Sequence, residues 1–223
     1  PLYATKIVRD EKIMNTSKIT LKYALLLGLI SLLCTAVSTG VYLLTKGRID
    51  EVTADQQRSL LHEVVLQDHF DNDLLATCKV ANLSEAPHLN RIYIAKKADK
   101  ITAYAIQGTA PDGYSGNIVL LMGIEPNGKV LGVRVLQHAE TPGLGDKIET
   151  RISDWILSFA GKLFSLENES SWAVKKDGGQ FDQFTGATIT PRAVVNNVRK
   201  NAKWVITQLV QHPELVDQLE ECK

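Results

Sequence analysis

The sequence is poor in the residue patterns that mark several common functions. It has 25 basic and 25 acidic residues and therefore no net charge. Phosphate backbones are bound by clustered excess Lys and Arg, so this balance argues against a nucleic-acid-binding protein. Only three cysteines are present, without a CxxC or a Cys/His cluster, so no zinc or iron–sulfur site is predicted. Neither an internal repeat nor a GxGxxG dinucleotide fingerprint occurs.

One long apolar segment is present near the N-terminus. Residues 23–44, YALLLGLISLLCTAVSTGVYLL, contain no charged side chain. As a helix they would span about 33 Å, and a hydrocarbon core is about 30 Å thick. Five basic residues precede the segment (Lys6, Arg9, Lys12, Lys18 and Lys22), and Asp50, Glu51 and Asp55 follow it closely. This asymmetry predicts a cytoplasmic tail over 1–22, a transmembrane helix over 23–44 and an outer domain over 45–223.

A cleaved signal peptide is the alternative interpretation of this segment. Ala36-Val37-Ser38 has the small residues of a weak cleavage site. The apolar core of a signal peptide is usually 7–15 residues long, and this run is longer. The length favours a retained anchor.

The outer domain shows both strand and helix patterns. Strands are expected at residues 92–95 and 101–108, and a hairpin joins 117–125 to 129–137 through the turn Pro126-Asn127-Gly128. Both hairpin strands are apolar on both faces, which predicts a central, covered position in the sheet. Helices are expected at 48–67, 147–163, 191–211 (with Thr190 as N-cap) and 213–221. The predicted fold class is α+β, an antiparallel sheet flanked by helices.

The segment before the 191–211 helix has the most informative chemistry. It reads GGQFDQFTGATITPR and contains the small-residue turn Thr185-Gly186-Ala187-Thr188. Free N–H groups and the positive end of the helix dipole favour an anion such as phosphate at this position. A plain connecting turn would have the same features, so the layout leaves both interpretations open.

A resemblance to a known family extends this interpretation. Residues Asp182 to Thr188, DQFTGAT, resemble the flavinylation motif of FMN-binding domains. The resemblance implies a phosphoester bond between Thr188 and FMN, made by a flavin transferase that recognises the motif, with Asp182 assisting recognition or attachment. Thr185, Gly186 and Ala187 are the other implied cofactor-binding residues.

A second segment resembles the same family. The residues ETPGLG, from Glu140 to Gly145, resemble the loop that lines the flavin in FMN-binding domains, with Glu140, Thr141 and Leu144 as implied contacts. Gly113–Gly116 resembles a family turn, although a simple loop explains it equally well.

Over residues 18–212 the chain resembles the G-subunit family of Rnf electron-transport complexes. This implies a redox subunit in a bacterial inner membrane, with the other Rnf subunits as partners. The alternatives are the related C subunit of Na⁺-translocating NADH:quinone reductase, a free-standing electron carrier, and an anchored binding or assembly module without flavin.

The remaining residues with reactive side chains have simpler explanations. Cys78 and Cys222 either form a disulfide in an oxidising compartment or stay as two free thiols. The histidines are scattered and do not predict a metal site. No residue is assigned a catalytic role of its own, since in a flavin relay the redox chemistry belongs to the ring.

Overall fold

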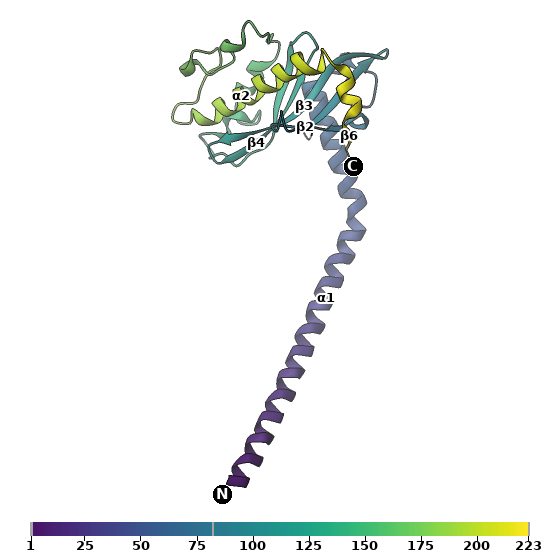
Figure 1. Ribbon diagram of the computed structural model, residues 1–223, viewed down its shortest axis with the longest axis vertical. Coiled ribbons are helices and arrows are strands. Elements are labelled where there is room, and N and C mark those ends of the chain that lie inside the picture. The colour runs from purple at the N-terminus through teal and green to yellow at the C-terminus, as the bar shows by residue number, and fades with distance from the viewer. Residues whose placement is uncertain (1, 82, 223) are drawn as a thin grey trace. The chain divides into compact units, whose positions relative to one another are not determined.

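The computed structural model describes residues 2–81 and 83–222, and within the first helix its side chains from Ile19 onward. The chain divides into two compact units, residues 1–53 and 54–223. The boundary lies inside the long helix α1, Leu2–Val64. Figure 1 shows α1 and, separately, the sheet and helix of the second unit.

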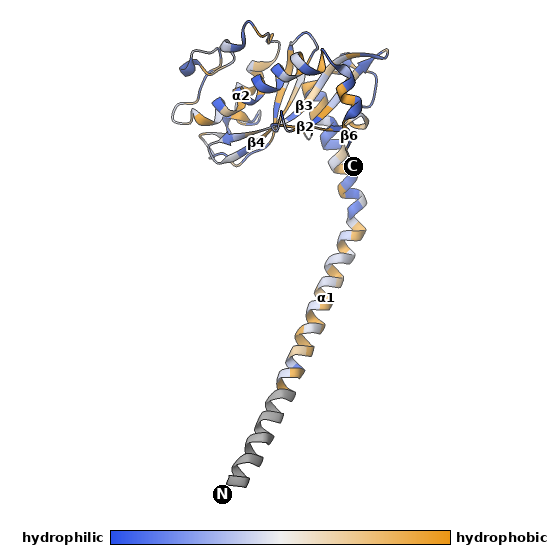
Figure 2. Cartoon of the chain, viewed as in Figure 1, coloured by the Kyte–Doolittle hydropathy of each residue, from blue (hydrophilic) through white to orange (hydrophobic). Residues whose placement is uncertain are grey.

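The first unit is helical and apolar in its middle part. Its most apolar 18-residue window is free of contacts that bury it, and the helix is long and apolar enough to cross a membrane. Figure 2 shows mainly apolar colours along this stretch and hydrophilic turns after it. The hydroxyls of Ser31 and Thr35 donate to the carbonyls of Gly28 (2.9 Å) and Ser31 (2.8 Å) in their own helix. These polar groups are therefore satisfied without a partner helix, as a hydrocarbon environment requires.

The second unit is built on a six-stranded sheet in the order β5-β4-β3-β2-β1-β6, in which every neighbouring pair is antiparallel. The strands are β1 Lys79–Val80, β2 Leu89–Lys97, β3 Lys100–Gly113, β4 Gly116–Ile124, β5 Val130–Gln137 and β6 Glu220–Glu221. The long helix that packs on this sheet is α2, Ile189–Trp204, which continues into a π-helical turn at Val205–Leu209. The predicted α+β class, with an antiparallel sheet and flanking helices, is confirmed.

The two faces of the sheet bury different elements. On one face α2 packs against β3 through a large apolar cluster that includes Ile106, Val194 and Val198. On the other face the end of α1 contributes Leu61, Val64 and Val65 to a second cluster, together with Tyr93, Ala105 and Leu121. The second unit is thus a three-layer arrangement in which the sheet is covered on both sides.

A glycine in β4 permits the close approach of α1 to the sheet. A Cβ atom on Gly123 would lie 2.0 Å from the carbonyl oxygen of Val64. Gly132 of β5 is its cross-strand partner. Glycines inside strands commonly mark such a close backbone approach.

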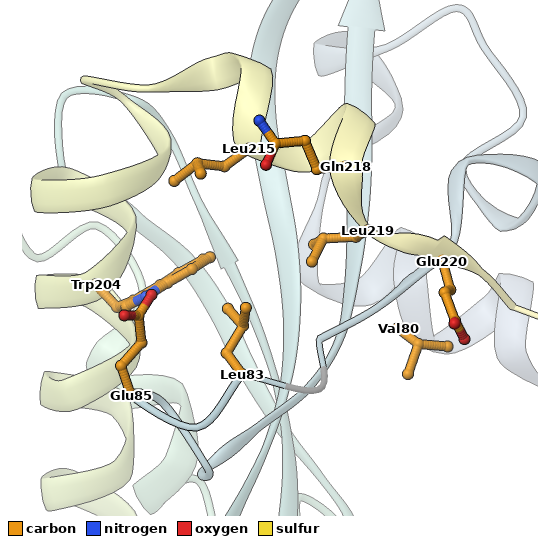
Figure 3. Close-up of a pocket in the computed structure, with 8 residues that line it drawn as sticks. All are labelled: Val80, Leu83, Glu85, Trp204, Leu215, Gln218, Leu219 and Glu220. Atoms are coloured by element: carbon orange, nitrogen blue, oxygen red, sulfur yellow. The ribbon is translucent and has the colours of Figure 1, made fainter.

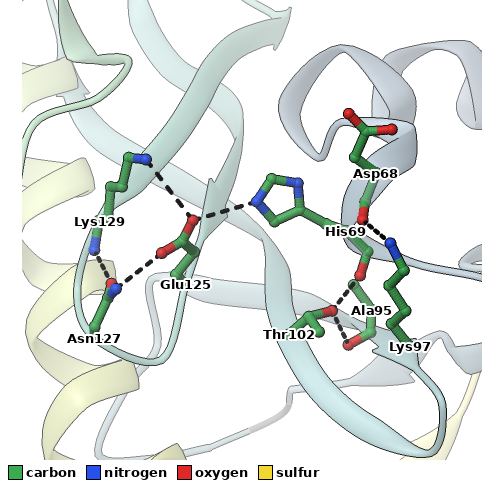
Figure 4. Close-up of polar contacts among 8 residues, drawn as sticks. All are labelled: Asp68, His69, Ala95, Lys97, Thr102, Glu125, Asn127 and Lys129. Atoms are coloured by element: carbon green, nitrogen blue, oxygen red, sulfur yellow. Dashed lines mark hydrogen bonds and ion pairs between the residues drawn. The ribbon is translucent and has the colours of Figure 1, made fainter.

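Polar contacts fix the segment that follows α1 (Figure 4). His69, in the 3₁₀ turn Gln67–His69, contacts Glu125 at the β4–β5 turn through Nε2 and Oε1, 3.2 Å apart. The Asn127 amide donates to the other Glu125 oxygen (2.8 Å). In the turn itself Gly128 N–H donates to the Glu125 carbonyl (2.9 Å), and Gly128 has a φ of +92°. The predicted turn, followed by a glycine in the left-handed conformation, is therefore confirmed, and its type I geometry stays a prediction.

The expected central position of the hairpin is wrong, because β5 is an edge strand. Its first residue is covered in another way. Val130 N–H donates to the Lys162 carbonyl (2.9 Å), and Gly161 N–H donates to the Val130 carbonyl (2.8 Å). A returning loop, rather than a further strand, satisfies this part of the edge.

The helix expected at 147–163 does not form. The structure has only two short 3₁₀ turns there, Asp146–Ile148 and Trp155–Phe159. The Ser153 hydroxyl donates to the Lys147 carbonyl (2.6 Å), and the Phe159 ring stacks on Phe181 with centroids 4.3 Å apart. Local side-chain bonds and tertiary ring packing thus replace the helical ladder.

The predicted limits of the last two helices also differ from the structure. Thr188, not Thr190, is the N-cap residue of α2. The segment after His212 forms the 3₁₀ turn Pro213–Gln218 and then β6, which pairs with β1. The other short 3₁₀ turns are Leu75–Thr77, Glu169–Ser171 and Lys175–Asp177.

Candidate functional site

A pocket of about 240 Å³ brings together the segments singled out in the sequence. Its walls come from three places: the β3–β4 turn, the loop after β5 and the start of α2. The lining residues are Tyr114, Glu140, Thr141, Leu144, Gly145, Gly186, Ala187, Thr188, Ile189 and Thr190. Six of the eight residues expected at a cofactor site therefore line one pocket.

Thr188 lines this pocket at the start of α2. It is half-buried, and its side chain makes no capping hydrogen bond at the start of α2. The preceding turn depends on Gly186, whose φ of +80° is the left-handed conformation that glycine adopts without strain. Ala187 N–H closes this turn on the Phe184 carbonyl (3.1 Å). The pocket thus contains a hydroxyl without a capping hydrogen bond, beside the N-terminus of a 16-residue helix.

Glu140 links the three segments of the pocket wall. Its side chain is only 4% exposed. One carboxylate oxygen accepts a hydrogen bond from Ser115 N–H (3.0 Å) in the β3–β4 turn, and the other accepts one from the Thr190 hydroxyl in α2. The carboxylate is therefore satisfied on both oxygens, as a buried charge requires.

A series of hydrogen bonds through His138, Glu149 and Arg151 holds the loop that contains Glu140. Glu140 N–H donates to His138 Nδ1 (3.0 Å), so His138 carries its proton on Nε2. That Nε2–H faces Glu149 Oε1 at 2.5 Å, and Arg151 donates to both Glu149 oxygens. The Arg151 guanidinium, helped by His138 and opposed by partial burial, lowers the pKa of Glu149 to about 2.

Apolar side chains surround the mouth of the pocket. Tyr114 is 67% exposed, Leu144 46% and Ile189 45%. Large apolar side chains at a concave surface suit a flat aromatic ligand. Together with the free hydroxyl and the helix N-terminus, they form a site with one apolar and one anion-favouring part.

Asp182 and Thr185 do not line the pocket. The Asp182 carboxylate is exposed and contacts Lys175 Nζ at 2.5 Å. Its carbonyl accepts a hydrogen bond from Trp155 Nε1 (2.7 Å), which fixes the start of the motif. Phe184 is buried edge-on against the same indole, with ring centroids 5.1 Å apart. The Asp182 carboxylate therefore lies outside the pocket lining.

Four lining residues are not among the predicted site residues: Tyr114, Gly145, Ile189 and Thr190. Tyr114 lies in the turn Gly113–Gly116, whose family resemblance is the available signal. Thr190 is a helix cap by local pattern, and its true partner Glu140 is 50 residues away. No local pattern in the sequence reveals such a contact.

A second pocket of about 390 Å³ lies elsewhere, between the chain after β1 and the C-terminal segment. Figure 3 shows Trp204, Leu83, Leu215 and Leu219 turned toward it. None of the predicted site residues lines it. Nearby, Cys78 and Cys222 form a disulfide with Cα atoms 5.4 Å apart. Among the described residues no group of three His, Cys, Asp or Glu could hold a metal.

Two family models match the chain. An FMN-binding domain matches residues 113–203, and an RnfG N-terminal region matches residues 14–64. The first match contains the three segments that form the smaller pocket.

Several curated relatives are similar over most of their length. The G subunit of the ion-translocating oxidoreductase complex of Haemophilus influenzae (strain 86-028NP) is 58% identical over 85% of this chain and 91% of that protein. The protein of the same name from Pasteurella multocida (strain Pm70) is 56% identical over 89% and 99%. Among solved structures, Shewanella oneidensis NqrC is similar over 70% of this chain and 72% of that chain, with a TM-score of 0.43 and 20% identity.

Proposed function

The chain belongs to the G-subunit family of ion-translocating oxidoreductase complexes, and from this premise we propose that it holds FMN through a phosphoester bond to Thr188. It is a membrane-anchored, FMN-binding electron-transfer subunit of an Rnf complex. The covalent bond, the side of the membrane and the maturation partner are parts of the proposal.

The single observation that supports Thr188 is its free hydroxyl in the pocket. Three threonines lie between residues 185 and 190, and their environments differ. Thr185 is exposed and outside the pocket lining, and the Thr190 hydroxyl is buried and donates to Glu140. Of the three, only Thr188 lines the pocket with a hydroxyl that makes no capping bond.

The residues present fit FMN. The start of α2 offers unpaired N–H groups for the phosphate, and Gly186 leaves the turn open to a bulky group. Leu144, Ile189 and Tyr114 offer apolar contacts for the ring, and Thr141 offers a hydroxyl for polar atoms. When bound, FMN supplies exchange between two-electron and one-electron carriers. The chain supplies the tether, the orientation and the electrostatic environment.

The anchor places this domain beside its partners. We propose that residues 1–22 lie in the cytoplasm, that residues 23–44 cross the inner membrane and that residues 45–223 lie on the outer side. Covalent attachment suits that side, since a dissociated cofactor would be lost. The partners are the other subunits of the complex and, during maturation, a flavin transferase that meets the exposed Asp182.

The test compares threonine variants made in a host that contains the flavin transferase. Thr188→Val should abolish flavin fluorescence in the protein band after denaturing electrophoresis. Thr188→Ser, which keeps a hydroxyl, and Thr150→Val, which changes an exposed threonine outside the motif and the pocket lining, should keep it. Mass spectrometry of the peptide should place the mass of FMN less one water on residue 188, as a phosphoester requires. A dark wild-type band, with the transferase active on a control substrate, would leave an anchored domain without covalent flavin.

A further inference from the structure

Glu140 is exceptional among the charged residues of the described chain. Every other Asp, Glu, Lys and Arg whose exposure is described is at least partly accessible, whereas the Glu140 side chain is 4% exposed. It also lines the pocket that we assign to FMN, close to the apolar mouth. A charge in such a wall is weakly screened by water and acts strongly on whatever occupies the pocket.

Hydrogen bonds keep this side chain in place. Both oxygens accept, one from Ser115 N–H and the other from the Thr190 hydroxyl. Two glycines leave the space it occupies. A Cβ atom on Gly113 would lie 2.9 Å from Glu140 Oε1, and one on Gly145 would lie 2.9 Å from Glu140 Cβ. The site is shaped around a charge whose bonding partners here are neutral donors.

The charge has a direct consequence for reduction of a flavin. Uptake of two electrons and one proton by oxidised FMN leaves the ring with one more negative charge. A fixed carboxylate in the same pocket opposes that added charge and so favours the oxidised form. We propose that Glu140 lowers the reduction potential of the bound FMN. This inference rests on the proposed function, because it requires FMN in this pocket.

A substitution at Thr190 should shift the reduction potential in the direction opposite to that of Glu140→Gln. Its hydroxyl donates to the carboxylate and draws part of the negative charge toward itself. Thr190→Val removes that donor and leaves the carboxylate more negative toward the pocket. Glu140→Gln removes the charge and keeps a side chain of the same shape. Electrostatic tuning therefore predicts a potential that rises in Glu140→Gln and falls in Thr190→Val, whereas loosening of the pocket would move both in one direction.

The experiment is a potentiometric titration of the flavinylated full-length protein at pH 8.5. Glu140→Gln should shift the oxidised–reduced equilibrium at least about tenfold toward reduced flavin, which equals about 30 mV for a two-electron couple. Thr190→Val should shift it toward oxidised flavin. Glu169→Gln removes an equal charge that is paired with Lys203 outside the pocket, and it should leave the potential unchanged.

The outcomes separate this inference from the proposed function. A wild-type protein without flavin contradicts the proposed function itself. A flavinylated Glu140→Gln with the wild-type potential, or a Thr190→Val shift in the same direction as Glu140→Gln, overturns the tuning role and leaves the flavin site standing. If Glu140→Gln takes up no flavin, the direction of the Thr190→Val shift decides: toward oxidised flavin supports the role, and no shift or the reverse overturns it.

Discussion

At the scale of single residues, the site shows how environment separates groups of the same chemistry. Thr185, Thr188 and Thr190 are identical side chains within six positions, yet one is exposed, one lines the pocket with a free hydroxyl and one is buried on a carboxylate. Their roles differ accordingly: Thr190 stabilises the wall, and Thr188 is available for attachment.

The buried Thr190 hydroxyl should contribute to stability before any cofactor is present. Thr190→Val keeps the shape but leaves one oxygen of a buried carboxylate without its donor. Hydrogen bonds to charged groups are worth about 1.5–3 kcal/mol, and a loss in that range is expected. Thr185→Val changes an exposed threonine and should cost less than about 0.5 kcal/mol. Chemical denaturation of the flavin-free full chain in detergent measures the loss of stability in each of the two variants. Equal losses in the two variants would show that the Thr190–Glu140 bond does not matter.

The contacts of Glu149 with His138 and Arg151 should make the stability of the fold depend on pH in the acid range. The pKa of Glu149 falls from an ordinary 4.5 to about 2, chiefly through Arg151. A depressed carboxyl pKa stabilises the fold above pH 4.5, and this contribution is lost as pH falls toward 2. Arg151→Gln should therefore lower the stability of the fold at pH 7, by a modest amount because Arg151 is exposed.

The measurement is thermal unfolding of both proteins between pH 7 and pH 2. The difference in melting temperature between wild type and Arg151→Gln should be constant above about pH 5. It should shrink toward zero as the pH approaches 2. Lys147→Gln removes a nearby charge that has no carboxylate partner in the part of the chain described, so it should show no such window. A difference in melting temperature between wild type and Arg151→Gln that is unchanged at pH 2 would contradict this account of Glu149.

At the scale of elements, the C-terminal segment completes the sheet. The two-residue strands β1 and β6 pair at one edge, and the disulfide between Cys78 and Cys222 joins the chain just before β1 to the chain just after β6. Cys222 N–H also donates to the Cys78 carbonyl (3.1 Å). Such short strands pair weakly alone, so we expect the covalent link to hold this edge together.

Loss of the disulfide should destabilise the unit formed by residues 54–223. It closes a loop with a sequence separation of 144, and its removal should cost about 2–4 kcal/mol. Cys222→Ser should lower the melting temperature of the full chain and abolish the effect of added reductant. Cys34→Ser, which changes the free cysteine of α1, should leave both unchanged. A wild-type melting temperature insensitive to reductant would exclude a stabilising disulfide.

At the scale of the whole molecule, the proposed topology sets where the flavin can exchange electrons. In a host cell, a membrane-impermeant maleimide should label Lys176→Cys, an exposed position in the outer domain, without permeabilisation. Lys6→Cys in the N-terminal tail should be labelled only after the membrane is opened. Both variants are made in a Cys34→Ser background, with Cys78 and Cys222 joined. The reverse labelling pattern would overturn the proposed orientation.

The sequence by itself determined the features that depend on local pattern. An uncharged run of 22 residues must be a continuous helix in an apolar medium, because only a helix satisfies its own backbone there. The Pro-Asn-Gly turn marked the hairpin, and the small residues at 185–188 marked a turn ahead of α2, although the local pattern put the N-cap at Thr190 rather than Thr188. The two motifs that resemble FMN-binding domains named six residues that do line one pocket.

Only the tertiary structure decided what depends on contacts far apart in the chain. The edge position of β5, the replacement of a helix at 147–163 by two short turns, and the C-terminal strand β6 all follow from partners outside their own segments. The same holds for Thr190, a helix cap by local pattern and the donor to Glu140 in the fold. Hydrophobic periodicity and secondary-structure propensity depend on neighbours along the chain. Burial and hydrogen-bond satisfaction depend on neighbours in space, and these spatial neighbours alone place the carboxylate of Glu140.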